Sequence, residues 1–583
     1  MNRPNIVFVL TDDQGYGDLG FTGNPHVKTP NIDTFASDAA RMTDFHVGPT
    51  CAPTRAGLMT GHYANSTGVW HTIGGRSLLR ENEWTLPAAL AESGYATGIF
   101  GKWHLGDTYP YRPHDRGFQS AVVHGGGGIT QTPDFWGNDY FDDTYFVNGR
   151  PRRFEGYCTD VWFDLAMRFI SDHKDSPFFC YVPTNAPHSP YNVEDRYADL
   201  YRGAESEARA RFHGMITNID ENFGKLRAHL RALGIEDNTV LIFMTDNGTS
   251  AGARVDSDGH VLDGYNAGRR GVKGSPYDGG HRVPFFLRYP AGGIAHGYDV
   301  NRIAANVDFM PTMLELCGIA PPPERSFDGR SLVPLIRSGS SGDVPSEWPD
   351  RVIVTDSQRV AYPVKWRMSS TMTDRWRLID GTELYDIRTD PAQRHDVSGE
   401  HSDVVAKLRA AYEAWWENVS RQFDRVIPHA IGGESWSESV LTSHDLRNDA
   451  CEVAWNQGHI RAAFRCRGYW ELRVETAGRY RIELRRWPRE LGYAVTAGIE
   501  GPDIEWRRDT IAASDHALYE GGTAVAATGA RLTVAGAEYT TPLEAGSAAA
   551  EFMVELPAGE TELTAEFPLG NEALAAYYVY ISR

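Results

Sequence analysis

The sequence is poor in cysteine and has no long apolar run. Six cysteines occur in 583 residues, and none is spaced as C-x-x-C or grouped with histidine at zinc-finger spacing. A disulfide scaffold and a structural zinc site are therefore not expected. The longest apolar runs cover about six to nine residues, far fewer than the ~18 that a transmembrane helix needs. We therefore expect no interaction with a membrane.

Positive charge is also scarce. Lys and Arg total 57 against 77 Asp and Glu, which gives a formal net charge of −20. A nucleic-acid-binding protein carries the opposite balance, so this class of protein is excluded. An acidic chain should also repel other anions, unless a local basic site overrides the overall field. An anionic substrate would therefore have to be held by cations gathered in one place.

The first residues lack the features of a secretory signal. Asn2-Arg3-Pro4 leads at once into a strand-like run, without a small-residue cleavage site. Together with the scarcity of cysteine, this start predicts a reducing, cytoplasmic location. The composition, 41% apolar and 23% charged, is that of an ordinary globular protein with a large core.

Apolar runs alternate with helical patterns in residues 1–340. The runs that resemble buried strands are 5–10, 95–100, 178–182, 239–244 and 283–287. Their continuous apolar character is typical of strands buried on both faces. Apolar residues at three-to-four spacing from Phe212 to Leu233 predict a helix that stops at Gly234. This order predicts an α/β fold with a mostly parallel central sheet flanked by helices.

Two further domains are predicted after residue 340. In 341–425, Asp380-Gly381 separates two strand-like runs and an amphipathic helix follows, which indicates a small α+β subdomain. In 440–583, period-two alternation such as Tyr480, Ile482 and Leu484 predicts a β-sandwich-like accessory domain. The sequence leaves two roles open for this accessory domain, which are covering a pocket and mediating homo-oligomerisation.

Polar groups follow four of the apolar runs. They are Asp12 and Asp13 after 5–10, Lys102 and His104 after 95–100, His188 after 178–182, and Asp246 and Asn247 after 239–244. Each group alone is more typical of a solvated turn or a helix cap. Ligands bind outside the carboxyl ends of parallel strands, however, so four such groups in one domain predict a single site.

The acidic members of this set predict a metal ion. Asp12, Asp13 and Asp246 could not all stay ionised side by side without a cation among them. Oxygen ligands alone, together with the amide of Asn247, favour a hard divalent ion. Ca²⁺ tolerates irregular carboxylate and amide sites best, so we expect Ca²⁺, with Mg²⁺ and Mn²⁺ as alternatives.

A second motif begins at Cys51 and reads Cys51-Ala52-Pro53-Thr54-Arg55, followed by Leu58-Met59-Thr60-Gly61. This segment resembles the C-x-P-x-R and L-x-T-G signature of the type I sulfatases, which belong to the alkaline phosphatase superfamily. The flanking motifs that resemble the family are Asp12-Asp13, Gly101-Lys102-Trp103-His104, Ala186-Pro187-His188, Asp246-Asn247-Gly248 and Arg270-Gly271-Val272-Lys273. The resemblance covers roughly residues 1–420, in the family's order.

The resemblance implies hydrolysis of aryl or other small sulfate esters with an alkaline-phosphatase-like fold. Cys51 would be converted by a formylglycine-generating enzyme to Cα-formylglycine, whose gem-diol is the nucleophile. The implied metal ligands are Asp12, Asp13, modified Cys51, Asp246 and Asn247. The other implied roles are held by Arg55 and Lys102, which hold the diol, His104, which takes its proton, and His188 and Lys273, which bind sulfate and protonate the leaving group.

Two other functions are compatible with the same residues. One is a phosphonate monoester or phosphodiester hydrolase, because these substrates are also tetrahedral oxyanions. The other is a non-catalytic calcium-binding protein with an inert Cys51, although such a protein has no need for Lys102 and His104. The glycine run 125–128 lacks the context of a phosphate loop and is expected to be mobile. A role for His281 is left open as structural or substrate-facing.

Overall fold

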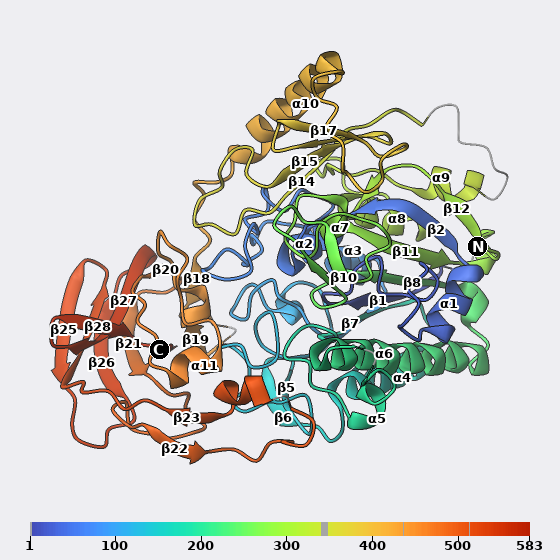
Figure 1. The fold of residues 1–583 in the computed structure, drawn as a ribbon. Coiled ribbons are helices and arrows are strands. Elements are labelled where there is room, and N and C mark those ends of the chain that lie inside the picture. The colour runs from blue at the N-terminus through green and yellow to red at the C-terminus, as the bar shows by residue number, and fades with distance from the viewer. Residues whose placement is uncertain (1–2, 204, 340–347, 435, 512) are drawn as a thin grey trace.

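The computed structural model describes residues 3–203, 205–339, 348–434, 436–511 and 513–583. Its largest element is a mixed sheet with helices on both faces, and the later part of the chain adds further sheets at one side (Figure 1). The strands of the large sheet lie in the order β12 (Tyr298–Val300), β2 (Ala40–His46), β11 (Arg282–Arg288), β8 (Thr239–Thr245), β1 (Asn5–Thr11), β7 (Phe178–Pro183), β3 (Ala96–Gly101), β4 (Ser120–Val123), β5 (Thr144–Val147) and β6 (Arg150–Arg153), and β13 (Ala304–Ala305) pairs with β2.

Strand β1 shows why the central run of the sheet is apolar throughout. Successive side chains of a strand point to opposite faces. Ile6 and Phe8 therefore join one core, with helices α2 (Cys51–Thr60), α3 (Leu86–Glu92) and α8 (Phe309–Leu316). Val7 and Val9 join the other core, with α1 (Pro30–Ser37), α4 (Cys158–His173) and α6 (Glu207–Ala232). The predicted α/β fold with covered faces is confirmed.

The four strands with polar groups at their ends run parallel to one another. β1 pairs with both β7 and β8, and β3 pairs with β7, all in parallel register. The strand expected at 283–287 differs, because β11 pairs antiparallel with β8 and β2. Residues 246–281, all of them described, contain only the short strands β9 (Ala253–Val255) and β10 (Val261–Gly264) and helix α7 (Asp278–His281). None of these elements is long enough to carry the chain back along the sheet. The chain therefore re-enters the sheet at the end from which β8 leaves, and β11 runs antiparallel to β8.

A four-stranded antiparallel sheet and one long helix follow. The strands are β14 (Ile353–Asp356), β15 (Ser369–Met372), β16 (Trp376–Ile379) and β17 (Glu383–Asp386), and the helix is α10 (Ser402–Ser420). Asp380 and Gly381 have φ of 49° and 68°, the left-handed values of a type I′ turn, and the Thr382 N–H donates to the Ile379 carbonyl at 2.9 Å. Leu408 of the helix packs on Leu378 and Leu384 of the hairpin. The predicted boundary at 340/341 lies outside the described residues.

The C-terminal β region, residues 427–583, contains two larger sheets around one core. One sheet consists of β18 (His429–Ile431), β20 (Trp470–Val474), β27 (Gly559–Leu569), β24 (Gly529–Val534), β25 (Ala537–Pro542) and β28 (Glu572–Ala575); the other consists of β19 (Glu438–Thr442), β29 (Tyr578–Ser582), β21 (Gly478–Arg485) and β26 (Ala550–Leu556). Leu472 and Leu563 of the first sheet share a core with Ile482 and Val554 of the second. Trp136, which precedes strand β5, is also buried in this core, so the two regions are joined by packing.

The absences noted in the sequence have structural counterparts. All six cysteines are free and buried. Within the described ranges, no helix has the length and apolar character needed to cross a membrane.

Candidate active site

The acidic pairs at the ends of β1 and β8 lie side by side. The two strands are paired in register to their last residues, which brings Asp12 and Asp13 next to Asp246 and Asn247. The Asp13 backbone N–H donates to Asp246 Oδ1 at 3.0 Å, and Asn247 Nδ2 donates to Asp13 Oδ1 at 3.0 Å. All four side chains are buried. The sheet therefore brings these four residues together, as predicted from their positions at strand ends.

Three cations surround these carboxylates, each from a different segment. The contacts are Lys102 Nζ to Asp12 Oδ2 at 2.5 Å, Lys273 Nζ to Asp13 Oδ1 at 2.6 Å and Arg55 Nη2 to Asp246 Oδ2 at 2.9 Å. Burial and the charge of Asp12 raise the pKa of Asp246 to about 7, although Arg55 and Lys102 lie nearby. A further cation beside Asp246 would lower this pKa and favour the ionised carboxylate.

Cys51 is the first residue of helix α2, and the whole helix is buried. Arg55 lies one turn later, and residues four apart share a helix face. Cys51 and Arg55 therefore both face the carboxylates, which explains the C-x-P-x-R spacing. Burial raises the pKa of the Cys51 thiol, and the charges of Lys102 and Lys273 oppose this effect without cancelling it. The unmodified thiol is therefore protonated at neutral pH and is a weak nucleophile.

The donor atoms around Cys51 fit a hard divalent cation. Ligand atoms of Asp12, Cys51 and Asp246 all lie within 4.8 Å of one another. Asp12 Oδ1 and Asn247 Oδ1 are buried, and neither has a hydrogen-bond partner in the described part of the chain. Buried oxygen acceptors are normally satisfied, so this pair is oriented for a ligand. Carboxylate and amide oxygens are the ligands that Ca²⁺ and Mg²⁺ prefer.

Two histidines complete the site. His104 Nε2 donates to the Thr72 carbonyl at 2.9 Å, which leaves Nδ1 without a partner among the described residues. Burial and the charge of Lys102 hold the pKa of His104 well below its usual value, so the ring is a neutral proton acceptor. His188 Nδ1 donates to the Ser189 carbonyl at 2.6 Å, and its Nε2 lies 3.7 Å from Asp13 Oδ2. Burial lowers the pKa of His188 to about 4.

The glycine run 125–128 packs on both histidines, so the prediction that it forms a mobile loop is wrong. All four glycines are buried. The Gly127 backbone N–H donates to Gln131 Oε1 at 2.7 Å. A Cβ on Gly127 would lie 2.2 Å from Cε1 of His104, and one on Gly128 would lie 3.5 Å from the His188 ring. Glycine is needed here because the backbone lies directly against an imidazole, a tertiary contact that the local pattern does not show.

We expect Gly127→Ala to lower kcat/KM of the reaction at this site by about 100-fold, because a misplacement near 1 Å has that effect on catalysis. The φ of Gly127 is outside the left-handed region, so the new methyl group clashes with His104 without straining the backbone. Steady-state kinetics, with the melting temperature as a check on folding, measure this effect. Gly128→Ala is the matched control and should stay within a few-fold of wild type; equal losses in both variants would contradict the proposed contact.

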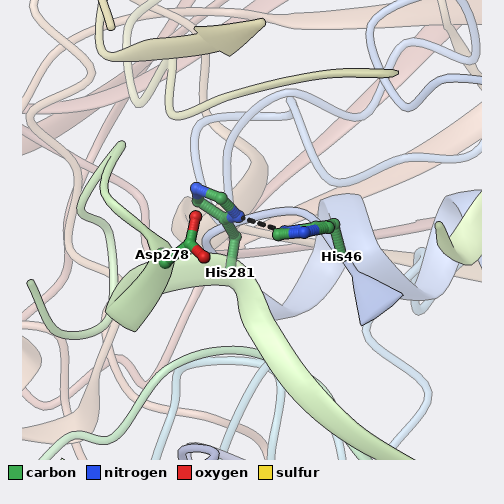
Figure 2. Close-up of side chains that lie close together, drawn as sticks. All are labelled: His46, Asp278 and His281. Atoms are coloured by element: carbon green, nitrogen blue, oxygen red, sulfur yellow. Dashed lines mark hydrogen bonds between the residues drawn. The ribbon is translucent and has the colours of Figure 1, made fainter. Parts of the chain in front are cut away.

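A second group of possible metal ligands, His46, Asp278 and His281, has a different explanation (Figure 2). His46 Nδ1 lies 2.9 Å from His281 Nδ1, and its Nε2 lies 3.0 Å from Asp44 Oδ1. His281 Nε2 donates to a backbone carbonyl at 3.0 Å. Arg377 Nε lies 2.9 Å from Asp278 Oδ1. Every ring nitrogen of the two histidines already has a polar neighbour, so we interpret this group as a buried ion-pair network and His281 as a structural residue.

The fold and this site define a hydrolase of the alkaline-phosphatase-like class, and comparison with known proteins gives its family. Residues 4–319 match the family model described as Sulfatase, and residues 273–417 match N-sulphoglucosamine sulphohydrolase, C-terminal. The chain therefore belongs to the sulfatase family and is a sulfuric ester hydrolase.

Similar proteins include several curated sulfatases. N-acetylgalactosamine-6-sulfatase of Mus musculus is 31% identical over 372 residues, which are 59% of this chain and 68% of the relative. Arylsulfatase A of Homo sapiens is 31% identical over 366 residues, which are 57% of this chain and 68% of the relative. The solved structure of Ps i-CgsB in complex with k-i-k-neocarrahexaose has 27% identity and a TM-score of 0.63, and the match covers 73% of this chain and 94% of that one.

Proposed function

We propose that the protein hydrolyses sulfate monoesters with a formylglycine nucleophile made from Cys51 and one divalent cation, probed first as Ca²⁺. The observation that carries the proposal is the position of Cys51 at the start of α2, with ligand atoms of Asp12 and Asp246 within 4.8 Å. A formylglycine-generating enzyme would then be required as a partner during maturation. When present, the cation would polarise the sulfate oxygens and the aldehyde hydrate would supply an oxygen nucleophile.

The chain's own residues take the remaining roles in this proposal. Asp12, Asp13, Asp246 and Asn247 would hold the cation, as their converging oxygens support. Arg55 and Lys102 would orient the nucleophile, and both are already fixed by buried carboxylates. The partner-free Nδ1 of neutral His104 is suited to accept a proton.

Lys273 and His188 would bind the sulfate group from the side of Asp13. Lys273 Nζ lies 2.6 Å from Asp13 Oδ1. Burial opposes the charge of Lys273, but the carboxylate of Asp13 outweighs burial and raises the pKa of Lys273, so the lysine stays cationic. His188 is neutral while the site holds only protein groups. The anionic sulfate group of a bound ester beside Nε2 would raise the pKa of His188 and allow this ring to protonate the leaving oxygen.

The proposed substrate class is a sulfated carbohydrate, because the relatives include N-acetylgalactosamine-6-sulfatase and a structure that contains k-i-k-neocarrahexaose. The net charge of −20 argues against long-range attraction of a heavily sulfated polymer. Small sulfated sugars and aryl sulfates are therefore the first compounds to test.

Mass spectrometry of the peptide around Cys51, combined with turnover assays, tests the proposal. Protein from a host with a formylglycine-generating enzyme should carry a residue about 18 Da lighter than cysteine at this position. The same protein should release sulfate from 4-nitrophenyl sulfate or a sugar sulfate. A preference of several orders of magnitude for a phenylphosphonate ester would instead assign the site to phosphonate or phosphodiester hydrolysis.

A further inference from the structure

The C-terminal β region contacts the loop 71–76, and this loop positions His104, one of the two histidines of the site. The Thr72 carbonyl accepts the hydrogen bond from His104 Nε2. Two residues later, the Gly74 backbone N–H donates to the His444 carbonyl at 2.8 Å. A Cβ on Gly75 would lie only 2.9 Å from the Asp445 carbonyl, so the two backbones are in close contact. The loop 71–76 is thus held between His104 and the C-terminal β region.

The same region also anchors the glycine run. Gln131, whose side chain binds the Gly127 N–H, forms an antiparallel bridge with Asn456. The Gln457 N–H donates to the Thr130 carbonyl at 2.9 Å. The two segments that contact His104, the loop 71–76 and the glycine run 125–128, are therefore both bound to residues 443–457.

One side chain of the C-terminal β region enters this neighbourhood. His444 lies in the short helix η5 (Ser443–Asp445) and is 1% exposed. Its Nδ1 lies 3.0 Å from Asp445 Oδ1, and its ring centroid lies 6.3 Å from that of His104. Its Nε2 is buried without a hydrogen-bond partner in the described ranges. A buried ring nitrogen is normally satisfied by a ligand, a water or a protein group.

The surroundings of His444 are polar. His71 is 7% exposed, and its Nδ1 accepts from the Thr72 N–H at 2.6 Å. Asp107 accepts from the Gly126 N–H at 3.0 Å. His71 belongs to the loop that Gly74 joins to the His444 carbonyl, and Asp107 binds the glycine run that lies against His104. Imidazole and carboxylate groups recognise hydroxyl groups, whereas an unsubstituted aryl ring offers them no partner.

We propose that His444 is a substrate-binding residue, supplied by the C-terminal β region, that hydrogen-bonds a hydroxyl of the alcohol part of the sulfate ester. Asp445 holds the ring with Nδ1 protonated, so that Nε2 is left for the substrate. This assignment rests on the proposed sulfatase activity and narrows its substrate to a hydroxyl-bearing alcohol, such as a monosaccharide. The C-terminal β region is then part of the active site.

The test compares two substrates in four proteins that carry formylglycine. These are wild type, His444→Ala, His444→Gln and the control His459→Gln, whose ring packs on Phe464 within the C-terminal β region. The substrates are 4-nitrophenyl sulfate and the best of a panel of monosaccharide sulfates that includes N-acetylgalactosamine 6-sulfate. We expect His444→Ala to lower kcat/KM for the sugar about 10-fold or more, mainly through KM, since a lost hydrogen bond has that magnitude. His444→Gln should restore part of the loss, and aryl sulfate turnover should stay within about two-fold.

Each other outcome overturns a distinct statement. If wild type hydrolyses neither substrate, the proposed function fails. If it hydrolyses only the aryl sulfate, the proposed function stands and the assignment of His444 to a hydroxyl-bearing substrate is wrong. Equal losses on both substrates, or none on either, would show that His444 acts only in packing or has no role. The control should match wild type on both substrates.

Discussion

Cys51→Ala should abolish sulfate ester hydrolysis, with a loss of kcat of at least about 10⁴-fold, as expected when a nucleophile is removed. Unmodified wild-type protein, made in a host without a formylglycine-generating enzyme, should be equally inactive. The reason is that burial raises the pKa of the Cys51 thiol and keeps it protonated beside Asp12 and Asp246. Turnover of 4-nitrophenyl sulfate per mole of protein measures both losses, and mass spectrometry gives the aldehyde content of each preparation.

Cys466→Ala is the control for this experiment. Cys466 is a free, buried thiol in the core of the C-terminal β region, so its removal should leave kcat within a few-fold of wild type. Full activity of unmodified protein would contradict the formylglycine mechanism. Full activity of Cys51→Ala would remove Cys51 from the chemistry altogether.

The local features of the site were predictable because they lie at positions that a parallel sheet dictates. Each polar pair follows a buried strand, and the parallel, in-register pairing of β1 and β8 brings Asp12 next to Asp246. The helical spacing of Cys51 and Arg55 likewise places both on one face. What each of these residues does in the reaction stays a proposal until variants are measured.

The features that sequence reasoning missed depend on tertiary contacts. Gly127 is required by the imidazole against it, and nothing in the neighbouring sequence indicates His104. His444 lies beyond the residues 4–417 that the family models match, and its contacts with Gly74 and His104 place it near the site. The direction of β11 depends on how residues 246–281 turn back, which apolar runs alone do not specify. A histidine followed by aspartate, as at His444-Asp445, was the one visible signal, and it is too common to be specific.

Among the proposed variants, Arg377→Met should lower the free energy of unfolding the most. Arg377 lies on β16, is 0% exposed, and joins the hairpin to Asp278 at 2.9 Å and to Asp44 of β2 at 2.8 Å. Removing one partner of a buried ion pair costs about 3–5 kcal/mol, because the remaining charges stay buried. We expect the lower end, since Arg282 still contacts both carboxylates at 3.1 and 3.2 Å. The melting temperature should fall by about 3–4 °C, because the unfolding entropy of a unit of roughly 400 residues is about 0.85 kcal/mol/K.

The pH dependence separates this explanation from a simple packing defect. Burial opposes ionisation of Asp44 and Asp278, but Arg377 outweighs it and holds the pKa of each below its usual value. In wild type the stabilisation that these two carboxylates contribute is therefore complete above about pH 4, the pKa of an aspartate in the unfolded chain. It is lost only as the pH falls through their lowered pKa values in the folded protein. In the variant, burial without Arg377 should raise both pKa values, so the folded state binds more protons and gains stability as pH falls from 7 to 5.

The difference in melting temperature between wild type and Arg377→Met should consequently narrow towards pH 5. Arg375→Met is the matched control, because Arg375 lies next to the same strand, pairs with Asp386 and has a 45% exposed side chain. Exposed ion pairs contribute little to stability, so this variant should melt close to wild type at every pH. A constant difference from pH 7 to pH 5 would mean that the lost packing of Arg377, and not the unpaired carboxylates, accounts for the destabilisation.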